Sequence, residues 1–133
     1  MSSSTPPEQP ATILIVDDEA ETRALFQMML RPHANWRVLE AETGQQAIEI
    51  AEAERPDVIL LDVMMPDLDG IEVCARLRQL PHLRATKIVM LTVLHTQSSR
   101  DAAVAAGADG LWTKPISPQV LRSDIVRLLG GSA

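Results

Sequence analysis

The chain has 133 residues, of which 46% are hydrophobic and only 2% aromatic, and it carries a formal net charge of −6 at pH 7. This length suits one compact domain and leaves no room for a second, and the core is expected to consist of Val, Ile, Leu, Met and Ala. The twelve Lys and Arg residues are scattered, which argues against direct binding of nucleic acid. A single cysteine excludes an internal disulfide and a cysteine metal site.

The two ends of the chain differ in composition from its middle. Residues 1–11 are rich in Ser and Pro and are expected to form a disordered tail, whereas residues 131–133 are expected to be a frayed end or the start of a linker. Residues 12–130 are the predicted domain. Because no apolar run approaches the roughly 18 residues of a membrane-spanning helix, we expect a soluble protein of the cytoplasm that does not contact a membrane.

Strands and helices are predicted to alternate, beginning with the apolar run 13–16, which has the composition of a strand covered on both faces. Helical spacing follows over 25–29. A second strand at 36–40 interleaves polar residues, as a strand at a sheet edge does. Thr43 is the predicted cap of a second helix, whose apolar face includes 47–51.

The second half of the chain continues this alternation. Its predicted elements are a strand at 58–61, a helix around 71–75, a strand at 88–91, an Ala-rich helix over about 97–106, a short strand at 111–113 and a helix that Ser117 caps and Pro118 begins. The whole pattern predicts an α/β fold: a five-stranded parallel sheet in the order 2-1-3-4-5, wrapped by five helices in a flavodoxin-like sandwich of three layers.

Polar residues follow four of the five predicted strands. In open parallel sheets, functional residues collect beyond the carboxyl ends of the strands, next to the point where the strand order reverses. The end of the second strand, at 40–42, is expected to lie outside this cluster. The residues expected to gather are Asp17 and Asp18 after the first strand, Asp62 at the end of the third, Thr92 at the end of the fourth and Lys114 after the fifth.

Three neighbouring carboxylates repel one another unless a cation compensates their charge. An all-oxygen site that keeps several waters suits Mg²⁺ or Mn²⁺, and Lys114 would supply a second positive charge. Flanked by both charges, a carboxylate such as Asp62 can attack phosphorus, since phosphoryl transfer chiefly needs alignment and neutralisation of the phosphoryl oxygens. The hydroxyl of Thr92 could then donate a hydrogen bond to a phosphoryl oxygen.

Four segments carry a resemblance to a known family. The sequence ILIVDDE at 13–19, LLDVMMPDLDG at 60–70, MLT at 90–92 and AAGADGLWTKP at 105–115 resemble the four signatures of response-regulator receiver domains, which share the fold of the chemotaxis regulators. They stand in the same order and at suitable spacing. The resemblance covers about residues 12–130.

The resemblance implies a role for each matching residue. Asp62 would be the phosphoacceptor, Asp18 would bind the metal directly and Asp17 largely through metal-bound water, and Lys114 would contact the phosphoryl group. The backbone carbonyl of Met64 would complete the protein ligands. The remaining implied features are a cis bond between Lys114 and Pro115 and a loop shaped by Pro66 and Gly70, with the glycine serving a conformation that side chains disfavour.

The family also implies partners. The phosphodonor would be a sensor histidine kinase or a histidine phosphotransfer protein, and the fourth helix, fifth strand and fifth helix would present the altered surface to a downstream effector, an output domain or a second copy of the chain. Such a domain promotes its own phosphorylation but is not an enzyme that acts on a pool of substrates.

The sequence departs from the family pattern near this site. Where receivers usually carry a switching aromatic there is Leu111, and Trp112 beside it should point to the opposite face of the sheet. Val93 follows Thr92 where a smaller residue is usual. Met64 and Leu94 offer no polar side chain to position an attacking water, which predicts a long-lived phosphoryl state.

Two other functions use similar features. An aspartate-nucleophile phosphohydrolase shares the carboxylate chemistry, but it usually has a second acid two residues after the nucleophile, where this chain has Met64. A flavodoxin-like cofactor binder would need a phosphate loop rich in Ser, Thr and Gly after the first strand, where this chain has 17–19, all acidic. A plainer alternative is that Asp17 and Asp18 only cap the first helix.

Overall fold

The computed structural model describes residues 11–31, 36–65, 69–93 and 96–130. Its strands form one parallel sheet in the order β2-β1-β3-β4-β5, which confirms the predicted order. The outer strands are the two that the sequence placed near sheet edges. The strands are β1 (Ala11–Val16), β2 (Trp36–Ala41), β3 (Val58–Asp62), β4 (Lys87–Thr92) and β5 (Gly110–Thr113).

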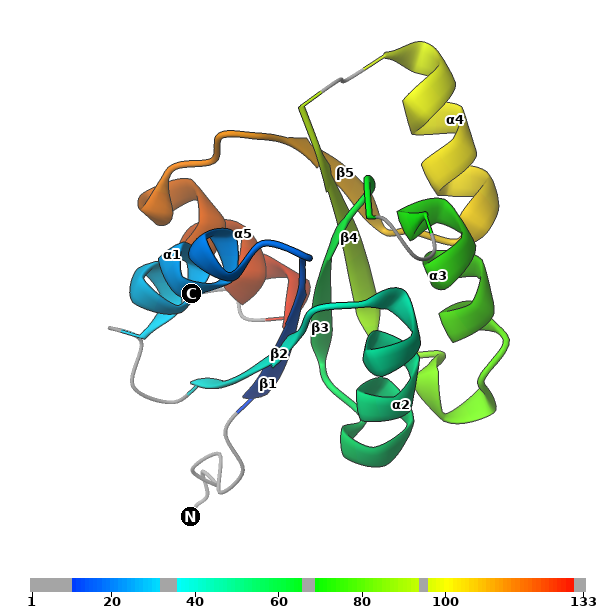
Figure 1. Cartoon of the computed structure of the whole chain (residues 1–133), viewed down its shortest axis with the longest axis horizontal. Helices are drawn as coiled ribbons and strands as arrows, with labels where there is room; N and C mark the ends of the chain where they lie inside the picture. Colours follow the sequence, from blue (N-terminus) through cyan, green and yellow to red (C-terminus); the bar gives the residue numbers. More distant parts are fainter. Residues whose placement is uncertain (1–10, 32–35, 66–68, 94–95, 131–133) are drawn as a thin grey trace.

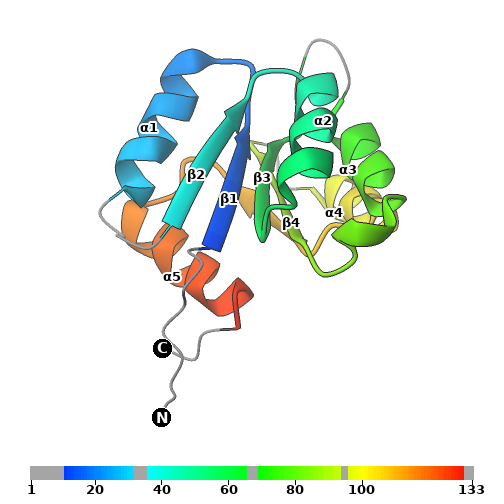
Figure 2. The same cartoon turned by 90° about the horizontal axis from the view of Figure 1, so that it is seen from below.

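Helices cover both faces of the sheet and give the predicted three layers. Figure 1 shows α1 and α5 on one side and α2, α3 and α4 on the other, and Figure 2 shows β2 at the edge between α1 and α2. A short 3-10 helix, η1 (Pro81–Leu83), precedes β4 and was not predicted. The helices are α1 (Ala20–Leu30), α2 (Gly44–Glu54), α3 (Gly70–Arg78), α4 (Gln97–Ala106) and α5 (Pro118–Leu128).

The core consists of two apolar clusters, one on each face of the sheet. Alternation along β1 sends Ile13 and Ile15 toward Phe26 of α1, and Leu14 toward the α2 and α3 side. Strands β1, β3 and β4 are buried on both faces, which explains their unbroken apolar runs. Each fully buried aliphatic side chain contributes about 1.5–3 kcal/mol, and this packing fixes where the strand ends lie.

Polar side chains define several helix starts. The Thr43 and Ser117 hydroxyls accept hydrogen bonds from the backbone N–H groups of Gln46 (3.0 Å) and Val120 (3.2 Å), as predicted. Helix α4 ends at Gly107, whose φ of 96° is in the left-handed region that favours glycine. Sequence reasoning missed Asp69, which caps α3, and Thr96, which caps α4.

Cys74 lies on the buried face of α3, where its thiol contacts the carbonyl oxygen of Ala106 at 3.5 Å. Burial raises the pKa of this thiol to about 11, although the charge of Arg78 acts in the opposite direction. We therefore expect the folded chain to react with a thiol-alkylating reagent at pH 8 at least about 100-fold more slowly than the urea-unfolded chain. Mass spectrometry of the alkylated fraction over time measures this ratio, and equal rates would contradict the buried placement.

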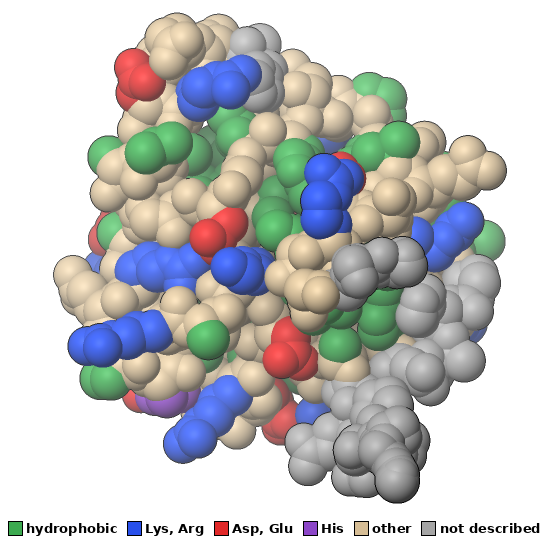
Figure 3. Space-filling view, turned by 180° about the vertical axis from the view of Figure 1, so that it is seen from behind, with side chains coloured by type: hydrophobic (Ala, Val, Ile, Leu, Met, Phe, Trp, Pro, Cys, Tyr) green, Lys and Arg blue, Asp and Glu red, His purple; other side chains and the backbone are tan. Residues whose placement is uncertain are grey.

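The surface has no single basic stripe on the side drawn in Figure 3, where Lys and Arg side chains alternate with acidic and apolar ones among the residues described. Within the described ranges, no helix has both the length and the apolar composition needed to cross a membrane.

Candidate functional site

The ends of β1, β3 and β5 bring the predicted polar residues together. Carboxylate oxygens of Asp17, Asp18 and Asp62 lie within 4.8 Å of one another. Asp17 and Asp62 are buried, with 2% and 9% of their surface exposed, whereas Asp18 is exposed. The acidic group therefore opens to solvent on the side of Asp18.

Backbone hydrogen bonds hold the strand ends in register. The N–H of Asp17 donates to the carbonyl of Ala41 at 3.1 Å, and the N–H of Lys114 donates to that of Thr92 at 2.8 Å. On β3, the N–H of Val63 donates to the carbonyl of Leu91 at 3.0 Å. These bonds carry the sheet pairing up to the acidic group, so the strands themselves place its side chains.

Each buried carboxylate also accepts a bond from a nearby backbone N–H. Asp17 Oδ1 accepts from Glu19 at 2.9 Å, and Asp62 Oδ1 accepts from Met64 at 3.3 Å. The cap position of α1 is Glu19, which makes no side-chain cap bond. Asp17 and Asp18 precede this cap position, so the structure does not give them the simple role of capping α1.

Lys114 lies between the two buried carboxylates. Its Nζ is 3.4 Å from Asp17 Oδ2 and 3.6 Å from Asp62 Oδ1, and its side chain is 22% exposed. One ammonium group leaves the three carboxylates with a net negative charge. Because carboxylate oxygens are hard ligands, the acidic group fits a hard divalent cation.

Burial raises the pKa of Asp62 above its usual value. The charge of Lys114 lowers it, the charge of Asp17 raises it, and hydrogen bonds from Met64 and Lys114 lower it further. With its pKa raised, the ionised form of Asp62 is disfavoured in these surroundings. A cation beside the carboxylate would reverse this effect.

Thr92 is buried at the end of β4, next to β3, where Asp62 pairs with Leu91 in the sheet register. Its neighbour Val93 is exposed by 63%, and Met64 by 67%. Both apolar side chains therefore stand at the surface around the acidic group. Two other residues of the predicted site, Pro66 and Leu94, lie outside the described residues.

Gly70 is required for a different reason from the one predicted. Its φ is not in the left-handed region, so the expected conformational reason is wrong. A Cβ at this position would lie 2.3 Å from the carbonyl oxygen of Asp62 and 2.8 Å from Cα of Val63. Gly70 therefore permits α3 to begin directly against the end of β3.

The Lys114–Pro115 peptide bond, after β5, is cis.

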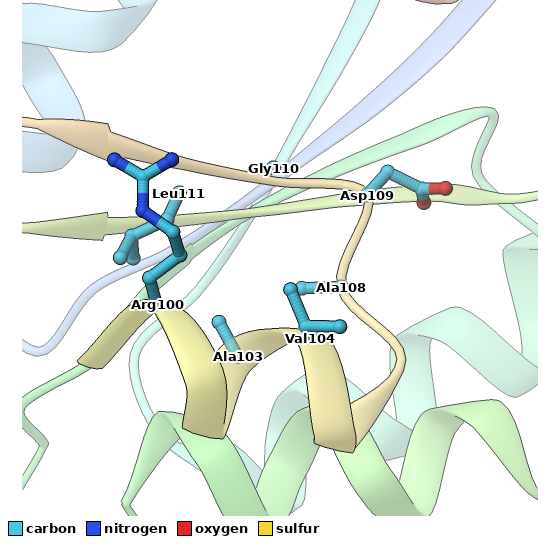
Figure 4. Close-up of a pocket in the computed structure, with 7 residues that line it drawn as sticks. All are labelled: Arg100, Ala103, Val104, Ala108, Asp109, Gly110 and Leu111. Atoms are coloured by element: carbon cyan, nitrogen blue, oxygen red, sulfur yellow. The ribbon is translucent and has the colours of Figure 1, made fainter. Parts of the chain in front are cut away.

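Leu111 and Trp112 point to opposite faces of the sheet, as predicted. Leu111 packs with the cluster under α2, α3 and α4, and Trp112 packs with the cluster under α1 and α5. A cavity of about 200 Å³ separates β5 from α4 (Figure 4), with Arg100, Ala103 and Val104 on its helical wall and Leu111 on the strand side. All of its lining residues are non-aromatic.

Sequence reasoning missed Arg23, whose Nη1 donates to the backbone carbonyl of Asp17 at 2.8 Å. The only available signal was its place one turn after Glu19 in a predicted helix. Glu40 lies outside the acidic group, as expected, but its Oε1 is 2.9 Å from Nε of Arg23. The end of β2 is thus connected to the acidic group indirectly.

Comparison with known proteins assigns the family. A model described as "Response regulator receiver domain" matches residues 13–126. The alkaline phosphatase synthesis transcriptional regulatory protein PhoP of Bacillus subtilis (strain 168) is 40% identical over 117 residues, which cover 88% of this chain and 48% of PhoP. This chain thus spans about half the length of the curated relatives it matches.

Solved structures agree with this assignment. Chemotaxis protein CheY4 of Vibrio cholerae superposes with a TM-score of 0.85 at 31% identity, covering 90% of this chain and 98% of that one. A receiver domain of a sensor histidine kinase from Pseudomonas aeruginosa PAO1, with a magnesium ion coordinated in its active site cleft, gives 0.83 at 30% identity, covering 92% and 99%. Together with the acidic group at the sheet edge, these matches show that the chain belongs to the response regulator receiver domains of two-component systems.

Proposed function

We propose that Asp62 accepts a phosphoryl group from a sensor histidine kinase or a histidine phosphotransfer protein, with Mg²⁺ or Mn²⁺ held by Asp17, Asp18 and Asp62. The observation that carries this proposal is the placement of a buried carboxylate, two further carboxylates and Lys114 at one edge of the sheet. The backbone carbonyl of Met64 is the fourth protein ligand that we propose.

The side chains of this site have separate tasks in the transfer. The carboxylate of Asp62 forms the new O–P bond while the bond between phosphorus and the donor breaks. Lys114 reaches Asp62 and Asp17, and in the phosphorylated chain it pairs with the phosphoryl oxygens instead. A bound divalent cation would neutralise the remaining negative charge of carboxylates and phosphoryl group.

Thr92 connects the new charge to the rest of the domain. It lies at the end of β4, four residues before Thr96, which caps α4. We propose that the hydroxyl of Thr92 donates a hydrogen bond to a phosphoryl oxygen of phosphorylated Asp62. Helix α4 has one buried residue, Ala103, and a cavity beneath it, so few contacts oppose a shift of this helix. The altered α4–β5–α5 surface would then meet an effector, an output domain or a second copy of the chain.

The phosphodonor would dock beside α1. A groove of about 410 Å³ next to the site is lined by Leu25, Phe26 and Met29 of α1 and by Val93, Lys114 and Pro115, among others. Exposed Leu25 and Met28 add apolar surface on the same helix. An apolar surface adjoining the acceptor carboxylate suits a protein donor better than a small substrate.

We also propose that the chain acts in the cytoplasm, that its domain comprises residues 12–130, and that this domain does not bind nucleic acid directly.

Intact-mass spectrometry tests the proposal with a small phosphodonor such as acetyl phosphate. With Mg²⁺ the chain should gain a single phosphoryl adduct, and with EDTA it should gain almost none. Steady release of phosphate over many turnovers without an adduct would favour the phosphohydrolase. A coloured preparation with no adduct would favour a flavin binder.

The exposed apolar side chain of Met64 predicts a slow loss of the phosphoryl group. Replacing Met64 by Asn should shorten the lifetime of the adduct several-fold, because an amide next to the acceptor can orient an attacking water. Met28→Asn, at an equally exposed methionine of α1, is the matched control and should leave the lifetime unchanged. Decay of the adduct in time-resolved intact-mass spectra gives both rates, and equal lifetimes for all three chains would contradict this role of Met64.

A further inference from the structure

We propose that Glu40 tunes the affinity of the acidic site for its cation by neutralising Arg23, although Glu40 itself is not a ligand. This inference rests on the proposed metal site. It concerns two residues at the side of the site that faces β2. Neither was among the residues predicted to act there.

Arg23 joins three elements of the fold. From α1, its Nη1 donates to the backbone carbonyl of Asp17 at 2.8 Å, and its Nε donates to Oε1 of Glu40 at 2.9 Å. Gln27, one turn later, donates through Nε2 to Oε2 of Glu40 at 2.9 Å. Both oxygens of Glu40 are therefore engaged, and the guanidinium is fixed one hydrogen bond from the main chain of a proposed ligand.

The sheet register brings Glu40 to this place. Glu40 pairs with Ile15, and Ala41 pairs with Val16 immediately before Asp17. In parallel strands, paired neighbours send their side chains to the same face. Ile15 belongs to the cluster under α1 and α5, so Glu40 also points toward α1, where Arg23 lies.

The charge of Arg23 would oppose a cation in the acidic site. Its side chain is only 12% exposed, compared with 36% for Glu40, so water screens the guanidinium incompletely. Arg23 donates to the main chain of Asp17, so a cation held by the carboxylates would lie roughly 8 Å from the guanidinium. Even with the dielectric constant of water, one unbalanced positive charge at that separation would weaken the binding of a divalent cation at least roughly five-fold at low salt. Glu40 removes this penalty while Arg23 keeps its bond to Asp17.

The experiment is a titration of the unphosphorylated chain with Mg²⁺, followed by backbone amide chemical shifts, in about 20 mM and about 300 mM salt. The variants are Glu40→Gln, which preserves the shape of the side chain and one of its two acceptor oxygens, and the double variant Arg23→Gln with Glu40→Gln. The matched control is Glu54→Gln. Glu54 also pairs with an arginine, Arg37 of β2, at 2.6 Å, but at the opposite end of that strand.

Glu40→Gln should raise the Mg²⁺ dissociation constant at least roughly five-fold at low salt and by a clearly smaller factor at high salt. The double variant should return to within about two-fold of the native chain, because the unbalanced charge is gone. Glu54→Gln should bind as the native chain does.

Three results would overturn the role of Glu40: an unchanged affinity in Glu40→Gln, a loss that is equal at both salt concentrations, or a loss that persists in the double variant. Each leaves the metal site itself intact, since the native chain would still bind Mg²⁺. A native chain that shows no Mg²⁺-dependent shifts at Asp17, Asp18 or Asp62 would instead refute the proposed metal site.

Discussion

Asp62→Asn should abolish the phosphoryl adduct and make the metal-free fold more stable. The amide cannot act as the attacking oxygen nucleophile, so intact-mass spectra should show no adduct at this site. Burial raises the pKa of the Asp62 carboxylate, and the nearby charge of Asp17 adds to this effect while Lys114 opposes it. The ionised form is therefore disfavoured in the folded chain, and its removal should increase the free energy of unfolding.

The sign of the pH dependence follows from the raised pKa. Above the folded-state pKa, ionised Asp62 lowers stability, and this penalty is lost as pH falls through the folded-state pKa toward the unfolded value. Thermal unfolding without metal should therefore show a higher Tm for Asp62→Asn at pH 7 and a shrinking difference in acid. Asp101→Asn, on α4, is the control and should keep the adduct. An adduct of undiminished yield in Asp62→Asn, or a gap in Tm that does not change with pH, would contradict this account.

Gly70→Ala should be among the most damaging single substitutions in the chain. A Cβ there would lie 2.3 Å from the carbonyl oxygen of Asp62 and 2.8 Å from Cα of Val63, and both are backbone atoms that cannot rotate away. Gly70 also donates its N–H to the carbonyl of Val63 at 2.8 Å. Relieving the clash requires α3 to move away from β3, so we expect a loss of about 3 kcal/mol and a Tm lower by roughly 10 °C.

Gly110→Ala provides the matched control for this prediction. At Gly110 the nearest atom to a new Cβ is Nε1 of Trp112 at 3.5 Å, an ordinary contact. Its expected cost is therefore below about 1 kcal/mol. Urea unfolding of both variants gives the two free energies. Similar values for Gly70→Ala and Gly110→Ala would show that the close approach of α3 to β3 is not tightly constrained.

Local patterns predicted the sheet because its central strands are buried on both faces and therefore read as unbroken apolar runs. Local patterns also identified Thr43 and Ser117 as helix caps, since a hydroxyl directly before a helical pattern commonly accepts a hydrogen bond from the first turn. It placed the start of β1 two residues late, however. Ala11 and Thr12 extend the strand, and the N–H of Thr12 donates to Oδ2 of Asp57 at 2.8 Å, a partner 45 residues away that no local window contains.

The acidic group was predictable for a related reason. Parallel strands place their carboxyl ends at one edge, so residues directly after separate apolar runs must meet. The connection of Arg23 to Glu40 could not be anticipated in this way, because it depends on which face of β2 turns toward α1. The steric reason for glycine at position 70 could not be predicted either. It arises because the start of α3 packs against the backbone at the end of β3.

Paramagnetic Mn²⁺ tests directly whether Asp17, Asp18 and Asp62 hold one divalent cation beside Lys114, as we propose. Adding small amounts of Mn²⁺ to isotope-labelled chain broadens the amide resonances nearest to the bound ion. We expect the signals of these four residues to broaden first, while those of Thr12 and Asp57, at the other end of the sheet, stay sharp. Broadening centred elsewhere, for instance around Glu49 on α2, or uniform broadening without any centre, would contradict the account.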